Sequence, residues 1–253
     1  MRYKPFAVVA IAALSLTGLT APADASHSWN NYHWARTSNP FTLKLGDNVT
    51  PAWDGYLATT STDWSKSTVL DTIVVAGAAK GRCRGTTGRV EVCNNTYGST
   101  GWLGVASINV SGSHITLGTV KVNDTYFNTA KYNTTAWRNL VMCQEVGHTL
   151  GLGHNDENFE NTPTGTCMDY SNDPEPNQHP DAHDYEQLES IYSHLDSTTT
   201  VGAAVPGASS AKSGNSPAAW GRLVEGSRAK GVSTYVRNNS DGSKTITHVI
   251  WAR

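Results

Sequence analysis

The sequence is poor in charged residues, since only 16% of its 253 positions are Asp, Glu, Lys or Arg. The formal net charge of -2 implies no surface for a polyanion, so we expect no nucleic-acid partner. Lys and Glu are scarce, whereas Asn, Thr, Ser and Gly are frequent. This composition favours short strands and turns over long helices.

Long apolar runs are also missing. Beyond residue 25 no segment approaches the roughly twenty apolar residues that a membrane-spanning helix needs. The first 25 residues contain Arg2 and Lys4, an apolar run over 6–19 and a small-residue end at 23–25, which is typical of a signal peptide. We therefore predict a secreted protein whose mature chain begins near Ser26, with 17 basic and 20 acidic side chains.

Only four cysteines are present. In an exported chain we expect them to be paired, because an oxidising compartment preserves disulfides. Four cysteines allow three pairings. We favour Cys83 with Cys93 and Cys143 with Cys167 over the other two, because both loops close locally. The second bridge would join a histidine-bearing helix to a turn that carries a methionine.

Several short runs rich in β-branched and aromatic residues predict a small twisted sheet. They cover residues 41–49, 69–75, 89–93, 102–110 and 114–122. Apolar residues at helical spacing predict helices over 51–66, from about 136 to 150, and over 183–195. Thr134 or Thr135 can cap the second of these helices, and Gly151 offers its end.

The composition changes after residue 196. Residues 197–217 are mostly Ser, Thr, Gly, Ala and Pro, which predicts a flexible linker. Residues 218–253 alternate around a turn at 238–242, which predicts a β-hairpin. We therefore divide the chain into a signal peptide (1–25), a main domain (26–196), a linker and a hairpin appendage (218–253). The appendage is too short to fold securely alone, so we expect it to dock on the main domain or on a partner.

Residues 144–154 read QEVGHTLGLGH, which is the zinc-peptidase motif HExxHxxGxxH with Gln144 in place of the first histidine. On a helix, residues four apart share a face, so Gln144 and His148 point into one cavity beside Glu145. Gly151 permits the turn that brings His154 back. Three such ligands leave one position on zinc for water, and Glu145 can accept a proton from that water as it attacks a peptide carbonyl.

This motif, followed by Cys-Met-Asp-Tyr at 167–170, resembles the metzincin clan of zinc endopeptidases, which includes matrixins, astacins and serralysins. The resemblance implies that His148 and His154 bind zinc and that Glu145 is the general base. It also implies that Met168 forms the Met-turn beneath the metal. For Tyr170, the resemblance implies contact with the metal or with the oxyanion of the reaction.

The resemblance implies an α+β fold as well. It predicts a mixed twisted sheet with a backing helix, an active-site helix, the Met-turn and a C-terminal helix over 183–195. Residues 102–108 are the candidate edge strand that would bind substrate by strand addition. The C-terminal β-hairpin segment is not explained by the resemblance.

Gln144 is the departure from the motif. Its amide oxygen is neutral and a harder ligand than imidazole, so zinc affinity should fall unless another group helps. The shell could be completed by Gln144 itself or by one of four other side chains, namely Asp156, Tyr170, His27 and His33. Alternatively, only His148 and His154 hold the metal, weakly or not at all. The spacing of the other histidines, which include His114, His194 and His248, indicates no ligand role.

Two functions follow. The first is a secreted zinc-dependent endopeptidase that hydrolyses protein or peptide substrates, with Glu145 as general base and Tyr170 assisting the oxyanion. The second is a catalytically weak or inactive relative that acts as a secreted protein- or glycan-binding module. The presence of Glu145 favours the first function, and Gln144 favours the second.

Overall fold

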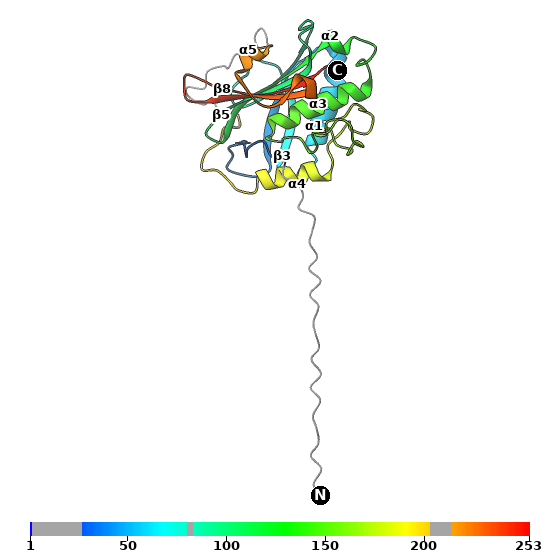
Figure 1. The fold of residues 1–253 in the computed structure, drawn as a ribbon. Helices are drawn as coiled ribbons and strands as arrows, with labels where there is room; N and C mark the ends of the chain where they lie inside the picture. Colours follow the sequence, from blue (N-terminus) through cyan, green and yellow to red (C-terminus); the bar gives the residue numbers. More distant parts are fainter. Residues whose placement is uncertain (2–26, 80–82, 203–213) are drawn as a thin grey trace.

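The computed structural model describes Met1 and residues 27–79, 83–202 and 214–253 (Figure 1). Apart from Met1, the predicted signal peptide lies outside the described residues, as does the central part of the predicted linker. Within the described ranges, no helix is both long enough and apolar enough to cross a membrane.

One mixed sheet of nine strands organises the described residues. Its first part is parallel and contains, in spatial order, β3 (Leu70–Ala76), β2 (Phe41–Asn48), β4 (Val90–Asn95) and β6 (His114–Asn123). The two-residue strand β1 (His33–Trp34) also pairs in parallel with the start of β6. The second part is antiparallel and continues from β6 through β5 (Trp102–Ser111), β9 (Lys244–Trp251), β8 (Val232–Asn238) and β7 (Arg222–Ser227).

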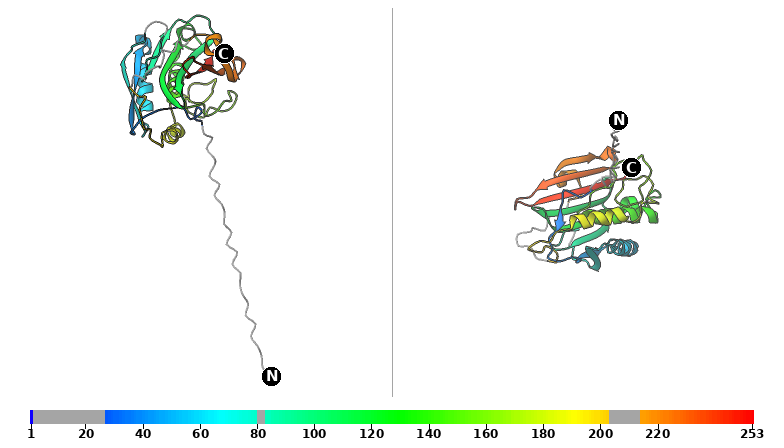
Figure 2. Two further views of the ribbon diagram at one scale, coloured as in Figure 1. Left: turned by 90° about the vertical axis from the view of Figure 1, so that its left-hand side faces the viewer. Right: turned by 90° about the horizontal axis from the view of Figure 1, so that it is seen from below.

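The longer helices pack on one face of this sheet (Figures 1 and 2). Helix α3 (Thr135–Thr149) contacts β5 and β6, and α1 (Pro51–Trp64) contacts α3 and β3. Helix α4 (Ala182–Ile191) contributes Leu188 and Ile191 to the same core. Short helical turns occur at α2 (Asp124–Phe127), α5 (Pro217–Trp220) and the 3-10 turn η1 (Arg228–Lys230). The arrangement is consistent with the predicted α+β class.

Helix α3 forms where the sequence predicts it. The Thr134 side chain caps its first turn by accepting a hydrogen bond from the backbone N–H of Trp137 at 3.2 Å. The helix ends before Gly151, which has a φ of +102°. A Cβ at this glycine would also collide with the carbonyl oxygen of Tyr32. Gly151 therefore meets two requirements, since it allows the left-handed turn and the close approach of the N-terminal segment.

Strand β5 was predicted as the substrate-binding edge strand, and this prediction is wrong. Strand β9 pairs with it along its length, from Trp102 opposite Trp251 to Val110 opposite Lys244. The physical reason lies in the side chains of β5, which are buried on both faces except at the last residue. A strand whose side chains are buried on both faces is typical of a sheet interior.

The C-terminal strands have apolar side chains on both faces. Ile246 and Ile250 belong to the main core under the helices. On β9, Val249 and Trp251 join a second apolar cluster with Trp220 of α5. Figure 1 shows α5 and α3 on opposite sides of these strands. The segment predicted as an appendage thus continues the main sheet, and β7 is a strand that the sequence pattern did not predict.

Both disulfides have the pairing that the sequence favoured. Cys83 is bonded to Cys93, and Cys143 is bonded to Cys167. The second bridge joins α3 to the segment that contains Met168. It fixes the helix that carries His148 to the neighbouring turn.

We expect the C-terminal strands to unfold together with the rest of the chain. The side chain of Ile246 is 1% exposed, so Ile246→Ala should lower the free energy of unfolding by about 2–4 kcal/mol. Val224→Ala is the control, since Val224 is 43% exposed and its loss should change stability by less than about 0.5 kcal/mol. Urea denaturation followed by fluorescence and circular dichroism should give one transition. Two separate transitions would contradict this expectation.

Candidate metal centre

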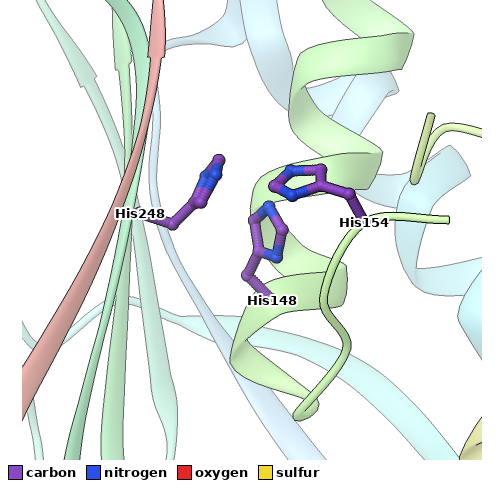
Figure 3. Close-up of side chains that lie close together, drawn as sticks. All are labelled: His148, His154 and His248. Carbon is purple, nitrogen blue, oxygen red and sulfur yellow. The ribbon is translucent and has the colours of Figure 1, made fainter. Parts of the chain in front are cut away.

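Three imidazole rings converge beside the end of α3 (Figure 3). His148 lies in the last turn of α3, His154 lies on the loop that follows, and His248 lies on β9. One ring nitrogen from each lies within 4.8 Å of the other two. Ligand atoms of a tetrahedral zinc site lie about 3.3 Å apart, because Zn–N bonds measure about 2.0–2.1 Å. A small inward movement of the rings would suffice to bind one ion.

The hydrogen bonding of these rings leaves nitrogen lone pairs available. The Nδ1 atom of His148 is 2.9 Å from the carbonyl oxygen of Leu152. A carbonyl only accepts hydrogen bonds, so Nδ1 carries the proton and Nε2 is free to bind a metal. The Nε2 atoms of His148 and His154 and the Nδ1 atom of His248 are buried without a hydrogen-bond partner. Buried nitrogens of this kind are costly unless a proton donor or a cation satisfies them.

Burial also keeps the three rings neutral. Desolvation lowers the pKa of His148 to about 4, and it lowers the pKa values of His154 and His248 well below the usual value. The neighbouring imidazoles lower the pKa of His154 and His248 further. Neutral imidazole is the form that binds a transition metal. The cluster is therefore a suitable ligand set for a transition-metal ion near neutral pH.

Gln144 is fully buried, and its amide nitrogen holds the turn after the motif. Nε2 donates to the carbonyl oxygens of Cys167 and Asp169 at 2.8 and 3.3 Å. Its Oε1 atom is buried without a hydrogen-bond partner. Gln144 thus ties α3 to the segment around Met168, close to the Cys143 bridge.

Met168 and Tyr170 lie close to the histidine motif. Met168 is fully buried beneath α3, and a Cβ on Gly147 would lie 2.6 Å from its sulfur. The ring centroid of Tyr170 is 3.9 Å from that of His154, and its hydroxyl is 3.4 Å from Nε2 of His248. Burial raises the pKa of Tyr170 well above its usual value, so its hydroxyl remains protonated.

Glu145 lies on the face of α3 that packs against β5. Its side chain is fully buried, and desolvation raises its pKa well above the usual value. A Cβ on Gly104 of β5 would lie 2.5 Å from Oε1, so only glycine leaves room for this carboxyl group. Glu145 is close enough to Tyr170 to raise the pKa of the phenol.

A cavity of about 290 Å³ opens beside the three histidines. Its walls come from residues 27–30, from the three imidazoles and from β7 and β8 through Glu225 and Thr234. The N-terminal wall is fixed, because the N–H of Trp29 donates to the carbonyl oxygen of Gly151 at 2.7 Å. Glu157 also lines this cavity, whereas Glu145 is not among its lining residues.

The other candidates for the metal shell have different surroundings. The Nε2 atom of His27 lies 3.6 Å from Oδ1 of Asp184. Asp156 accepts hydrogen bonds from Asn158 and Asn161. His33 belongs to a separate cluster, considered below. His248 was not predicted as a ligand. Its only signal in the sequence is its place in an alternating strand, because no spacing rule relates a strand histidine to a helix that ends about 100 residues earlier.

Comparisons with known proteins give little further information. No family model matches the chain, and no curated protein matches it either. Among solved structures, one crystal structure of myroilysin aligns with a TM-score of 0.37 and 12% identity, over 63% of this chain and 86% of that one. A second structure of myroilysin aligns with a TM-score of 0.39 and 12% identity, over 67% and 99%. Similarity this low assigns neither a family nor an activity.

We expect Gln144 to contribute to stability through its two hydrogen bonds. Gln144→Met keeps the length of the side chain but leaves two buried carbonyl oxygens unpaired, which should lower the free energy of unfolding by about 1–3 kcal/mol. Gln178→Met is the matched control. Because Gln178 is only half-buried, this substitution should lower the free energy of unfolding by less than about 1 kcal/mol. Chemical denaturation with a chelator present measures both. Equal stability of the two variants would remove this role for Gln144.

Proposed function

We propose that this protein is a secreted zinc-dependent endopeptidase with His148, His154 and His248 as its metal ligands. The convergence of three neutral imidazoles within 4.8 Å, of which those of His148 and His248 are buried and that of His154 is half-buried, is the observation that carries the proposal. Three protein ligands with one open position are the usual set for a catalytic zinc. The cavity beside the rings offers space for a substrate group at that position.

In this proposal His248 takes the place that the motif assigns to its first histidine. Gln144 then serves to hold the Met168 turn, as its hydrogen bonds to Cys167 and Asp169 support. The Tyr170 hydroxyl beside His248 helps to orient that ring. The ligand set thus combines one helix, one loop and one strand.

When bound, zinc would polarise the peptide carbonyl and lower the pKa of a water molecule. Glu145 is the proposed proton acceptor, because its raised pKa suits a carboxylate that must take up a proton and pass it on. The protonated hydroxyl of Tyr170 is the proposed donor to the developing oxyanion.

The substrate must approach by a route other than the edge of β5, because β9 occupies that edge. We propose entry through the cavity between residues 27–30 and the β7–β8 pair. A larger cavity of about 490 Å³ shares Glu157, Glu225 and Thr234 with it, so the two are adjacent. Together they provide room for several residues of an extended peptide or an unfolded protein segment.

The alternative function is a catalytically weak or inactive module that binds a protein or glycan. One observation favours it, namely that Glu145 is fully buried against β5 and is absent from the lining of the cavity. A carboxylate that never reaches the cavity could not serve as the base. The two functions differ in whether Glu145 affects turnover.

We expect the purified mature protein with zinc to cleave an unstructured protein such as casein, and Glu145→Gln to reduce kcat/KM by at least about 100-fold. Glu157→Gln is the matched control, because Glu157 is one of the two carboxylates that line the cavity and its loss should change kcat/KM less than about fivefold. If Glu157→Gln abolishes cleavage and Glu145→Gln does not, the base is misassigned. If no zinc-dependent cleavage occurs, the binding module is the better proposal.

His248→Ala should remove one bound zinc and abolish cleavage, since two remaining imidazoles hold the ion poorly. Gln144→Met should keep the bound zinc and the cleavage activity when assayed at a temperature where the variant is folded. Zinc content after gel filtration and casein cleavage measure these outcomes. Loss of zinc in Gln144→Met with retention in His248→Ala would make Gln144 the third ligand.

A further inference from the structure

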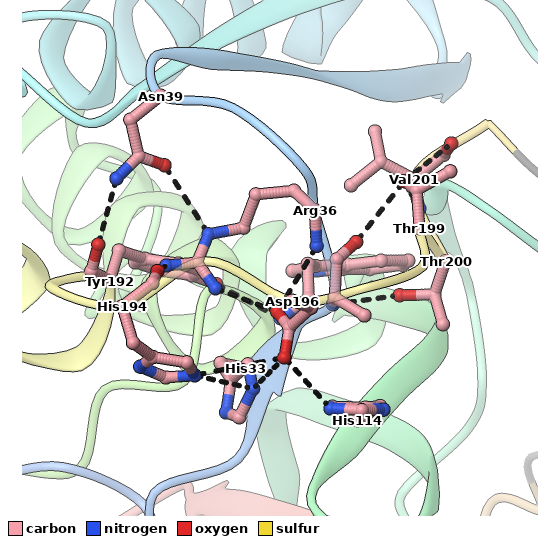
Figure 4. Close-up of polar contacts among 12 residues, drawn as sticks. His33, Arg36, Asn39, His114, Tyr192, His194, Asp196, Thr199, Thr200 and Val201 are labelled. Carbon is pink, nitrogen blue, oxygen red and sulfur yellow. Dashed lines mark hydrogen bonds and ion pairs between the residues drawn. The ribbon is translucent and has the colours of Figure 1, made fainter.

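A second group of histidines lies outside the motif, at the N-terminal end of β6 (Figure 4). It combines His33 of β1, His114 at the start of β6, and His194 and Asp196 after α4. These residues come from three segments that are far apart in the sequence. None of them contributes to the candidate metal centre described above.

We propose that His33, His114, His194 and Asp196 form a second, structural zinc site. Ligand atoms of His33, His114 and Asp196 all lie within 4.8 Å of one another, which suits one ion. His194 lies against His33 and Asp196 and would complete the set by a movement of its exposed ring toward His114. The Oδ1 atom of Asp196 lies 3.2 Å from Nε2 of His114, 3.6 Å from Nε2 of His33 and 3.8 Å from Nε2 of His194. The Nε2 atoms of His33 and His194 are 3.2 Å apart. Bonds of about 2.0–2.1 Å to zinc place neighbouring ligand atoms about 3.3 Å apart.

The hydrogen bonds around His33 and Asp196 orient them toward a shared point. The Nδ1 atom of His33 donates to the carbonyl oxygen of Asn31 at 2.8 Å, so its Nε2 atom presents a lone pair to the cluster. Oδ2 of Asp196 accepts from the backbone N–H of Arg36 at 3.2 Å and from its Nη1 at 2.8 Å. Oδ1 therefore remains available on the side of the three imidazoles.

Arg36 holds the segment that carries two of the proposed ligands. Its side chain is 2% exposed, and its guanidinium lies over the ring of Tyr192, 4.8 Å from the centroid. It also donates to the carbonyl oxygen of His194. His194 and Asp196 are thus positioned by one buried cation before any ion binds, which reduces the ordering that binding requires.

An ion can reach this cluster from solvent. The side chains of His114 and His194 are 36% and 45% exposed, whereas that of His33 is 3% exposed. The exposed pair forms the outer side of the cluster, and His33 with Asp196 forms its floor. This site would join β1, β6 and the segment after α4 into one cross-link.

The principal alternative is a hydrogen-bonded cluster without metal. In that case the Nε2 atoms of His194 and His114 carry protons that they donate to His33 and Asp196. The two states differ in zinc content and in the response of stability to zinc. Because stable binding of an ion at this site links three segments, it should raise Tm in a His248→Ala background, where the candidate catalytic ion is removed.

The test measures zinc content by mass spectrometry in four full-length mature proteins after equilibration with a competing chelator. These are the wild type, His248→Ala, the double variant His114→Ala/His194→Ala, and the triple variant. We expect about two, one, one and zero zinc ions per chain. His179→Ala is the control for loss of an exposed histidine, since its side chain is 52% exposed, and it should retain both ions.

The outcomes separate this site from the proposed peptidase centre. If the double variant binds as much zinc as the wild type, or its zinc affinity falls less than about tenfold, the second site is refuted. If His248→Ala binds as much as the wild type while the double variant loses one ion, the second site stands and the first fails. Anomalous scattering from zinc-soaked crystals should show a peak about 2.0–2.2 Å from His33 Nε2 and Asp196 Oδ1, and absence of that peak contradicts the proposal.

Discussion

The pairing of β9 with β5 is the constraint on which the candidate metal centre depends. It places a strand from the C-terminal end of the chain in the middle of the sheet, where Ile246 and Ile250 pack under the helices. Because side chains alternate along a strand, His248 lies on the same face as these two isoleucines and therefore faces the end of α3. A shift of one residue in the register would turn His248 to the opposite face.

Gln144 stands where the motif has its first histidine, and its side chain has a structural role. The amide donates two hydrogen bonds to the segment at 167–169 and so connects it to α3 beside the Cys143–Cys167 bridge. The position that supplies a ligand in the motif here supplies a hydrogen-bonded link, and the third imidazole comes from β9.

Much of the secondary structure follows from local pattern, because each element carries its own signal. Helix α3 has a capping threonine, an apolar face and a terminal glycine, and the structure places it within one residue of the predicted start. Both disulfides could be predicted because each closes a short loop. The position of β9 in the sheet cannot be predicted in this way. Its pairing with β5 joins residues about 140 apart, and no local pattern in the sequence indicates such a contact. For the same reason no spacing argument could have grouped His248 with His148, or His33 with Asp196.

Placement of His248 on the last strand also bears on when the centre can be assembled. A chain still emerging from a ribosome possesses His148 and His154 before residue 248 is available. Until β9 has docked, such a nascent chain has two of the three imidazoles and no closed cavity wall from β7 and β8. The proposed centre would thus be completed only after β9 has been synthesised and has paired with β5.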